Sequence, residues 1–285
     1  MRALKLSFVF SGFLSSMAQA ENWPQWRGPL GNGVSNETGV PTSWASDENI
    51  AWKTPLVGSA VSGPIVWGNQ VFVSSQLGRG IVRPGNHPTL VQGEGGAAEK
   101  SLGGSAASDP SVGKTYLLVE AFRRSDGERL WEYRFEAEGE FPEVHRKTNM
   151  ANPSPVTDGE LIYAWFATGQ LVALDTQGKL VWHRHLARDY SPFEIGWGHS
   201  SSPTLYKDSI LLLCDHTPAS YLLALDKKTG AEKWKVERGK GLRSYSTPFV
   251  AQGKDRDELI VNSSKGVDAY DPSTGEHFWF LPGPN

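Results

Sequence analysis

The chain has 285 residues, including 31 glycines, 18 prolines, 11 tryptophans and a single cysteine. This composition favours many hairpins and few long helices, and one cysteine excludes an internal disulfide. The formal net charge of −3 leaves no basic excess that would attract nucleic acid or anionic lipid.

Residues 1–20 have the pattern of a signal peptide. Arg2 and Lys5 precede an apolar run, and Ala18-Gln19-Ala20 fits a signal-peptidase site. The apolar run is shorter than the roughly 20 residues that span a membrane, and no cysteine follows the site to carry a lipid anchor. We therefore expect an exported protein without a membrane span, periplasmic or extracellular after cleavage near Ala20.

Residues 21–49 are rich in proline, glycine and asparagine, with scattered tryptophans. We interpret them as an extended N-terminal arm that lies over the rest of the fold. Ile50-Ala51-Trp52-Lys53 then has the pattern of a lone strand that closes a sheet formed by other parts of the chain.

The remaining residues, 50–285, contain four copies of one pattern. Each copy has short runs of aliphatic, β-branched and aromatic residues between glycine and aspartate turns, which predicts four strands joined by tight hairpins. The copies span residues 64–131, 155–182, 203–234 and 248–279. Four-stranded repeats of about 40–50 residues are the signature of a β-propeller, whereas a chance run of hairpins in a β-sandwich would not keep this register.

Each copy ends in a tryptophan at the same position. These residues are Trp131, Trp182, Trp234 and Trp279, which are 51, 52 and 45 residues apart. A large ring at a fixed position of every repeat is expected to dock against the adjacent sheet. We therefore predict an all-β fold, a β-propeller of four-stranded antiparallel blades with structural tryptophans between them.

Residues 78–114 interrupt the first repeat between its second and third strands. This insertion is rich in Gly, Ala and Ser and shows no periodicity. Long loops of this kind are functional or disordered, and the composition favours disorder. Gly93-Glu94-Gly95-Gly96 does not indicate a nucleotide-binding loop, because no strand precedes it and no helix is signalled after it.

The links between repeats carry the candidate ligand-binding residues. Each link leads from an outer strand to the next innermost strand, so all links should open on one mouth of a central channel. Convergent polar and aromatic groups at a concave mouth are the default ligand-site hypothesis. The alternative is that these groups only hydrogen-bond and pack the links. The candidates are His145, Asn149, Trp197, His199, Arg243 and Tyr245.

Motifs for catalysis or metal binding are absent from the sequence. No His-x-Glu-x-His or Glu-x-x-His pair lies on a predicted helix, and no Gly-x-Ser-x-Gly motif occurs. Cys214 follows an apolar run, as expected of a small buried side chain and not of a reactive thiol. We assign no catalytic residue and no metal ligand.

The repeat unit resembles that of the pyrroloquinoline-quinone-like (PQQ-like) propellers. Ala224-Leu225-Asp226 followed by Thr229-Gly230 and Trp234 carries this resemblance, and Trp23-Pro24-Gln25-Trp26-Arg27-Gly28-Pro29 resembles the mature N-terminus of secreted members common in planctomycete-type bacteria. The superfamily includes the quinoprotein alcohol dehydrogenases and the BamB outer-membrane assembly lipoprotein. The resemblance covers almost all of the mature chain.

The resemblance implies seven or eight blades, so we expect four blades to form an incomplete arc, as in a truncated chain. Open blade ends would then favour self-association, whereas a rival closed four-bladed ring would use Ile50 to Lys53 as an extra strand. The quinoprotein dehydrogenases hold their quinone beneath a vicinal disulfide beside calcium. Only Cys214 is present here, and no acidic and asparagine cluster matches, so we expect no PQQ and no other cofactor.

These patterns predict an exported binding or scaffold module that is not an enzyme. Its ligand would be a protein or a saccharide at the channel mouth, and nucleic acid is excluded by charge. The alternative is a quinoprotein-type oxidoreductase, or a hydrolase with a site carried by the mouth loops.

Overall fold

The computed structural model describes residues 21–78, 114–139, 141 and 148–283. The expected signal peptide and nearly all of the 78–114 insertion lie outside the described residues. Within them the fold is almost entirely β, with one short helix, α1 (Leu186–Asp189). No helix in these ranges is long and apolar enough to cross a membrane.

The strands form four sheets of four, which we call blades 1 to 4. Blades 1 and 2 are β1 (Ile65–Trp67), β2 (Gln70–Leu77), β3 (Tyr116–Arg123) and β4 (Arg129–Glu136), then β5 (Val156–Thr157), β6 (Leu161–Trp165), β7 (Gln170–Asp175) and β8 (Leu180–His185). Blades 3 and 4 are β9 (Thr204–Tyr206), β10 (Ser209–Asp215), β11 (Ser220–Asp226) and β12 (Glu232–Gly239), then β13 (Phe249–Gln252), β14 (Asp257–Ser263), β15 (Gly266–Tyr270) and β16 (His277–Pro282). Each blade is an antiparallel meander in chain order, which confirms the predicted repeats.

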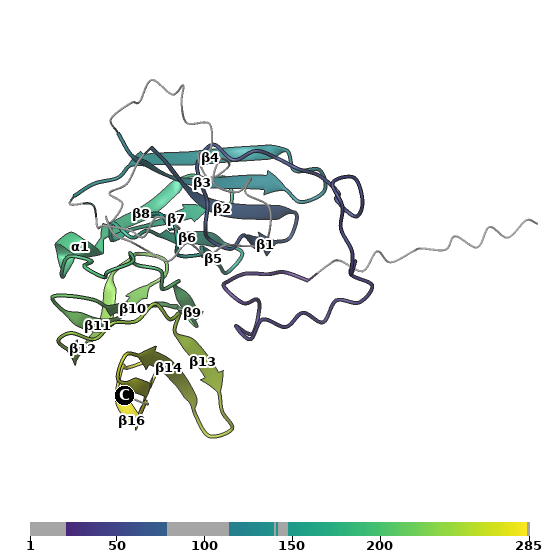
Figure 1. Ribbon diagram of the computed structural model, residues 1–285. Coiled ribbons are helices and arrows are strands. Elements are labelled where there is room, and N and C mark those ends of the chain that lie inside the picture. Colours follow the sequence, from purple (N-terminus) through teal and green to yellow (C-terminus); the bar gives the residue numbers. More distant parts are fainter. Residues whose placement is uncertain (1–20, 79–113, 140, 142–147, 284–285) are drawn as a thin grey trace, which may run out of the picture.

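The blades follow one another in an arc. Their first strands are neighbours in the order β1, β5, β9, β13. Figure 1 shows these four strands on the inner side of the arc, facing the N-terminal arm, and the fourth strands on the outer side. This radial arrangement is that of consecutive propeller blades, so the predicted fold class is confirmed.

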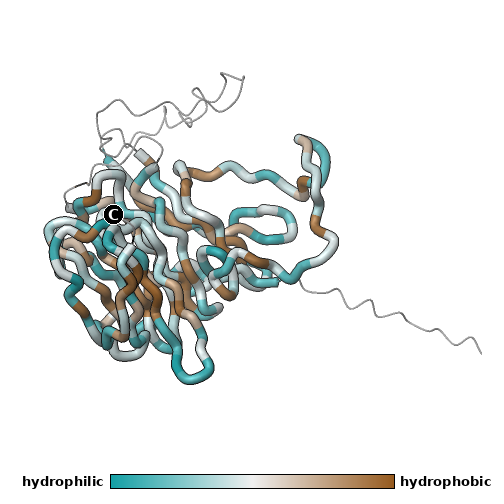
Figure 2. Tube along the Cα trace, turned by 60° about the horizontal axis from the view of Figure 1, so that its bottom comes forward, coloured by the Kyte–Doolittle hydropathy of each residue, from teal (hydrophilic) through white to brown (hydrophobic). Residues whose placement is uncertain are grey.

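The hydrophobic core consists of three layers, one between each pair of adjacent blades. Because side chains alternate along a strand, one blade contributes to two layers. In β7, Val172 and Leu174 pack toward blade 1, whereas Leu171 and Ala173 pack toward blade 3. Figure 2 shows the hydrophobic residues along the strands inside the fold, while hydrophilic residues occupy many of the turns.

A tryptophan at the edge of each of blades 1 to 3 docks on a glycine of the next blade. Trp182 in β8 lies over Gly230 in the β11–β12 turn, and a Cβ atom at Gly230 would come within 2.8 Å of the ring. The Trp182 indole also donates a 3.0 Å hydrogen bond to the carbonyl of Lys227. Only glycine allows this contact, because Gly230 has a φ of +71° as well as no side chain.

The same contact recurs along the arc. It joins Trp131 to Gly178 and Trp234 to Gly275. Trp279 is the exception. It is 36% exposed and contacts no glycine turn of a further blade among the described residues, and its indole donates to Glu258 of its own blade.

Residues 50–53 do not form the strand that the sequence suggested. Trp52 nevertheless docks like the other tryptophans, because its ring lies over Gly127 of blade 1 and its indole donates a 2.8 Å hydrogen bond to the carbonyl of Arg124. A strand requires a neighbour that satisfies its backbone groups, and no described strand pairs with this segment. The Trp52 contact therefore holds the segment on blade 1, together with a 2.6 Å hydrogen bond from the hydroxyl of Thr54, the residue that follows the segment, to the carbonyl of Gly127.

The N-terminal arm crosses the inner side of the arc. Trp23 pairs with Val66 of β1 through two backbone hydrogen bonds of 2.8 and 2.9 Å, and the carbonyl of Pro24 accepts a hydrogen bond from Thr157 in blade 2. Farther along, Gly31 lies against the ring of Phe249 in blade 4. The arm thus spans from the first blade to the last.

Candidate functional site

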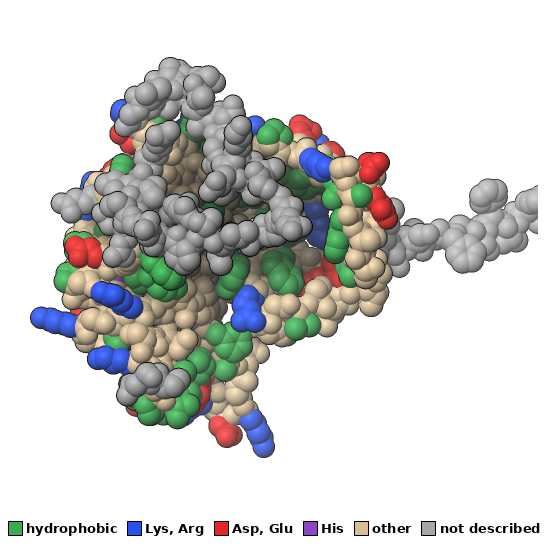
Figure 3. All heavy atoms as spheres, viewed as in Figure 1, with side chains coloured by type: hydrophobic (Ala, Val, Ile, Leu, Met, Phe, Trp, Pro, Cys, Tyr) green, Lys and Arg blue, Asp and Glu red, His purple; other side chains and the backbone are tan. Residues whose placement is uncertain are grey.

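A cavity of about 840 Å³ lies between the arm and the inner strands. Figure 3 shows a hollow between the blades and the arm, with hydrophobic and basic side chains near its edge. The lining includes hydroxyl and amide groups, among them Ser154, Ser202, Thr247 and Asn262. It also includes four aromatic rings, those of Trp26, Tyr206, Tyr245 and Phe249. Arg27 is the one charged side chain among the described lining residues, so most polar contacts of a ligand in the cavity would be with hydroxyl and amide groups.

Links between blades meet at one end of this cavity, which we call the mouth. Trp197 belongs to the link between blades 2 and 3, and Tyr245 to the link between blades 3 and 4. Their rings are nearly parallel, with an interplanar angle of 25° and centroids 6.0 Å apart, and they are 54% and 41% exposed. Thr148, in the link between blades 1 and 2, donates a 3.1 Å hydrogen bond to the carbonyl of Trp197. Three links therefore converge, and we call the Trp197–Tyr245 pair the aromatic platform.

The remaining candidates from the sequence have different environments. Asn149 uses its side chain to hold its own link, donating to the carbonyl of Ser59 at 2.8 Å and accepting from the amide of Ala151 at 2.9 Å. Arg243 is exposed at the mouth. His145 lies outside the described residues. His199 is buried, with 1% of its surface exposed, and is not part of the exposed mouth.

His199 belongs to a buried cluster between blades 2 and 3. Its ring lies 4.1 Å from the Trp165 ring and 5.3 Å from the ring of His216, which follows β10. None of the four imidazole nitrogens forms a hydrogen bond of normal geometry within the described part of the chain. Burial lowers the pKa of His216 to about 3. Burial and the neighbouring His216 hold the pKa of His199 well below its usual value, so both rings are neutral near pH 7.

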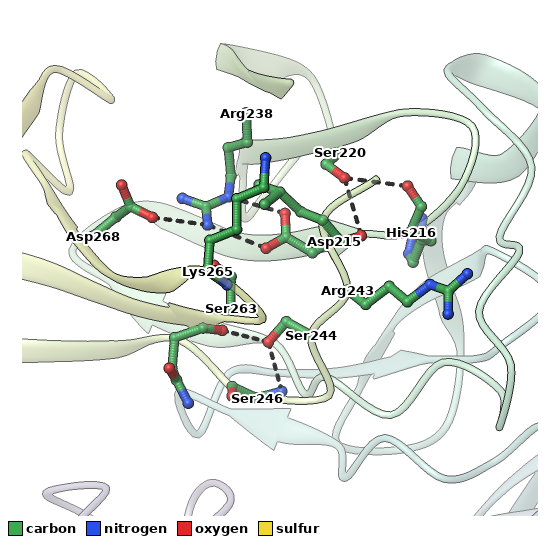
Figure 4. Close-up of polar contacts among 12 residues, drawn as sticks. Asp215, His216, Ser220, Arg238, Arg243, Ser244, Ser246, Ser263, Lys265 and Asp268 are labelled. Atoms are coloured by element: carbon green, nitrogen blue, oxygen red, sulfur yellow. Dashed lines mark hydrogen bonds and ion pairs between the residues drawn. The ribbon is translucent and has the colours of Figure 1, made fainter. Parts of the chain in front are cut away.

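A buried ion cluster that sequence reasoning missed joins blades 3 and 4. The Arg238 guanidinium in β12 lies between two carboxylates, 2.9 Å from Asp215 in β10 and 3.1 Å from Asp268 in β15 (Figure 4). It also donates a hydrogen bond to the Tyr270 hydroxyl. His277 adds a 3.0 Å contact to the other oxygen of Asp268. Burial raises the pKa of Asp215, and Arg238 opposes that shift. The cluster occupies strand positions between blades, and its role is to join them.

The described residues do not fit a quinone site of the quinoprotein type. Cys214 is fully buried in β10, where burial raises the pKa of its thiol, and it has no second cysteine to pair with. No group of three or more His, Cys, Asp or Glu side chains in the described ranges is arranged to hold a metal ion. Neither the disulfide nor the calcium ligands of such a site can be assigned.

Comparison with known families and structures agrees with the fold. The family model described as outer membrane protein assembly factor BamB matches residues 34–190 and 117–282. A search among curated proteins finds no significant match.

Solved structures with a similar fold include enzymes. Quinohemoprotein alcohol dehydrogenase from Comamonas testosteroni superimposes with a TM-score of 0.58 at 13% identity, over 94% of this chain and 42% of that one. A quinohemoprotein alcohol dehydrogenase from Pseudomonas putida gives 0.51 at 13% identity, over 81% and 35%. BamB from Moraxella catarrhalis gives 0.47 at 18% identity, over 81% and 54%. The chain thus spans about half or less of the length of these structures, and the likeness concerns the fold alone.

Proposed function

Since the chain belongs to the family of PQQ-like β-propellers whose model is described as outer membrane protein assembly factor BamB, we propose that it is an exported, non-catalytic binding or scaffold module. Its ligand is a protein or a saccharide that docks at the mouth. The family model covers most of the chain, and BamB is by its description an assembly factor. Export is part of the proposal, and N-terminal sequencing of the secreted protein, with Glu21 as the expected first residue, tests it.

The aromatic platform is the observation that supports this function. Trp197 and Tyr245 come from different links, yet their rings are nearly parallel and both residues are exposed. Exposed aromatic rings leave apolar surface in water, a cost that a ligand removes by covering them. Flat aromatic faces of this kind bind sugar rings, proline rings and other flat groups, and aromatic anchors commonly dominate binding energy.

The titratable groups support a binding role over catalysis. His199 and His216 have strongly shifted pKa values, but both are buried and neutral, so they cannot exchange protons with a ligand at the mouth. Arg238, Asp215 and Asp268 are engaged with one another between blades. A quinoprotein-type oxidoreductase or a loop-borne hydrolase remains the competing class.

A paired ligand screen tests the proposal. The full chain is immobilised and exposed to an extract of exported proteins and to a panel of soluble oligosaccharides. Trp197→Ala is expected to lose the bound species, because it removes half of the platform. The matched control is Trp44→Ala, which removes a tryptophan that is 64% exposed on the N-terminal arm. Equal binding by both variants, or turnover in a dye-linked alcohol oxidation assay, would refute the proposed function.

Self-association is a second part of the proposal. β16 exposes Phe280 and Leu281 to 46% and 62%, next to the undocked Trp279. An apolar strand surface of this kind favours contact between copies of the chain. Light scattering coupled to size-exclusion chromatography is expected to show species larger than a monomer, and a monomer at all concentrations would contradict it.

A further inference from the structure

Arg243 extends the aromatic platform into a row of three side chains. From Gly241 to Tyr245 the chain alternates between exposed and buried residues, and Arg243 and Tyr245 are both exposed. In an extended segment, residues two apart project from the same side. Arg243 therefore lies beside Tyr245, whose ring in turn lies beside Trp197.

The backbone at this point is held firmly. The Arg243 carbonyl accepts a 3.0 Å hydrogen bond from the amide of Ser264, and the buried Ser244 hydroxyl donates to the carbonyl of Asn262. The Arg243 guanidinium itself has no hydrogen bond or ion pair within the described residues. Figure 4 shows it projecting away from the Arg238 cluster, with no contact drawn to its charged end. The backbone of Arg243 is thus held in place, while its guanidinium group is available to bind an anion.

The described mouth carries a local excess of positive charge. Lys240, Arg243 and Lys265 are exposed and lack an ion pair there, against a single exposed and unpaired carboxylate, Glu194. The other nearby carboxylates, Asp215 and Asp268, are engaged by Arg238. This balance contrasts with the whole chain, whose formal net charge is −3.

We propose that this row binds an anionic saccharide, a chain of sugar rings that carries carboxylate or sulfate groups. A sugar ring lies on the aromatic platform and its anionic group pairs with Arg243, while neighbouring units extend toward the cavity. This inference rests on the proposed function and specifies its ligand. Arg243 is then the residue that makes anionic sugars bind more tightly than neutral ones, since guanidinium groups form strong paired hydrogen bonds with carboxylate and sulfate oxygens.

The cavity favours a saccharide over an acidic peptide. Its polar lining consists mainly of hydroxyl and amide groups such as Ser202, Thr247 and Asn262, which match the hydroxyls of a sugar chain. A run of acidic side chains offers carboxylates but no hydroxyl groups to that lining, so most of the lining's hydroxyl and amide groups would lack a matching partner.

Calorimetric titration of the full chain with defined probes tests the inference. Hexagalacturonate carries a carboxylate on every ring, and its methyl ester keeps the rings without the charge. A sulfated dextran oligosaccharide distinguishes sulfate from carboxylate, and polyglutamate represents an acidic peptide. We expect hexagalacturonate or the sulfated probe to bind, and the methyl ester to bind at least tenfold more weakly.

Two variants that each remove one positive charge distinguish a direct contact of Arg243 with the probe from general electrostatic attraction. Arg243→Gln is expected to reduce affinity for the anionic probe by about 10- to 100-fold, the range for a lost charged hydrogen-bond pair. Lys254→Gln is the control, because this exposed lysine lies in the β13–β14 turn at the opposite end of blade 4. It removes the same charge and should change affinity less than twofold.

Each outcome has a defined meaning. Equal binding of acid and ester, or an unchanged affinity in Arg243→Gln, would overturn the charge assignment and leave the binding module intact. Binding of polyglutamate alone would overturn the saccharide and favour an acidic protein partner. If no probe binds, this inference fails, while the platform screen with Trp197→Ala still decides the proposed function separately.

Discussion

Gly230→Ala isolates the tryptophan contact between blades 2 and 3. The added methyl group would lie 2.8 Å from Trp182, so the ring or the turn must move. Gly241→Ala is a close control, because Gly241 has nearly the same backbone angle (φ +73° against +71°) and a methyl group added there would meet no heavy atom within 4 Å. Both substitutions place alanine in the left-handed region, but only Gly230→Ala disturbs a neighbour.

The two variants should therefore differ by the cost of the disturbed contact. Left-handed alanine costs about 1–2 kcal/mol, which is the whole effect expected for Gly241→Ala. Displacing a packed ring adds about 1–3 kcal/mol, so Gly230→Ala should cost about 2–5 kcal/mol. The free energy of unfolding is measured by urea titration, with an unchanged m-value as the check that the transition is the same.

A double-mutant cycle tests whether Trp182 is the group that the added methyl disturbs. In the Trp182→Ala background there is no ring to displace, so Gly230→Ala should cost only the backbone cost of left-handed alanine, about 1–2 kcal/mol. The difference between its cost in the two backgrounds is a coupling energy of about 1–3 kcal/mol. If Gly230→Ala and Gly241→Ala destabilise equally, or if Gly230→Ala and Trp182→Ala are additive, the tryptophan does not dock on the glycine in solution.

Four further outcomes are expected. Trp182→Ala and Trp234→Ala should each destabilise by about 3–5 kcal/mol in thermal melts, whereas Trp279→Ala, which lacks a glycine partner in the described residues, should cost under about 1 kcal/mol. Because the folded pKa of His216 is below the unfolded value near 6.5, its stabilising contribution is complete above that pH and is lost on acidification. Between pH 7 and pH 5 this loss is about 2 kcal/mol, and His199 adds to it; His216→Phe should flatten the pH dependence, unlike the exposed control His183→Gln. Arg238→Met leaves buried carboxylates unpaired and should cost about 3–5 kcal/mol in urea unfolding, whereas Arg188→Met, at the exposed pair with Glu138, should cost less than about 1 kcal/mol. Dialysis against PQQ and calcium should leave no stoichiometric quinone in the visible spectrum, and a retained quinone would restore the oxidoreductase alternative.

The sequence predicted the blades well because their signal is local and repeated. Many of the turns between strands contain glycine or aspartate, and every repeat ends in a tryptophan, so four copies reinforce one another. The expected strand at residues 50–53 was wrong because a strand depends on a partner, and a pattern of four residues does not show whether one is present.

The candidate site was less predictable because the links have no periodic pattern. Trp197 and His199 are two residues apart in the same link, yet the first is exposed and the second buried. Which of the two side chains is buried depends on the contacts of the link with blades 2 and 3, and these contacts cannot be read from the sequence. Equally, the pairing of Arg238 with Asp268 joins residues of two blades, and no short-range rule links them.

A signal for that cluster was nevertheless present. Asp268 precedes Ala269, the residue that pairs with the closing tryptophan of blade 4. At the same place in blades 2 and 3 stand Val172 and Leu223. A carboxylate among aliphatic equivalents indicates a buried partner, and the same comparison singles out Glu120 in blade 1, whose carboxylate is buried beside the amide of Val57.

The tryptophan–glycine contact also makes one whole repeat the unit by which blades can be added or removed. Each of the repeats ending at Trp131, Trp182 and Trp234 supplies a ring to the following repeat. Each also supplies the glycine on which the preceding ring lies, which is Gly127 for Trp52, Gly178 for Trp131 and Gly230 for Trp182. Duplicating or deleting one whole repeat would therefore leave every ring before Trp279 with a matching glycine. Gene duplication could change the number of blades without creating an unmatched contact inside the array, since stability depends on nearest-neighbour interfaces.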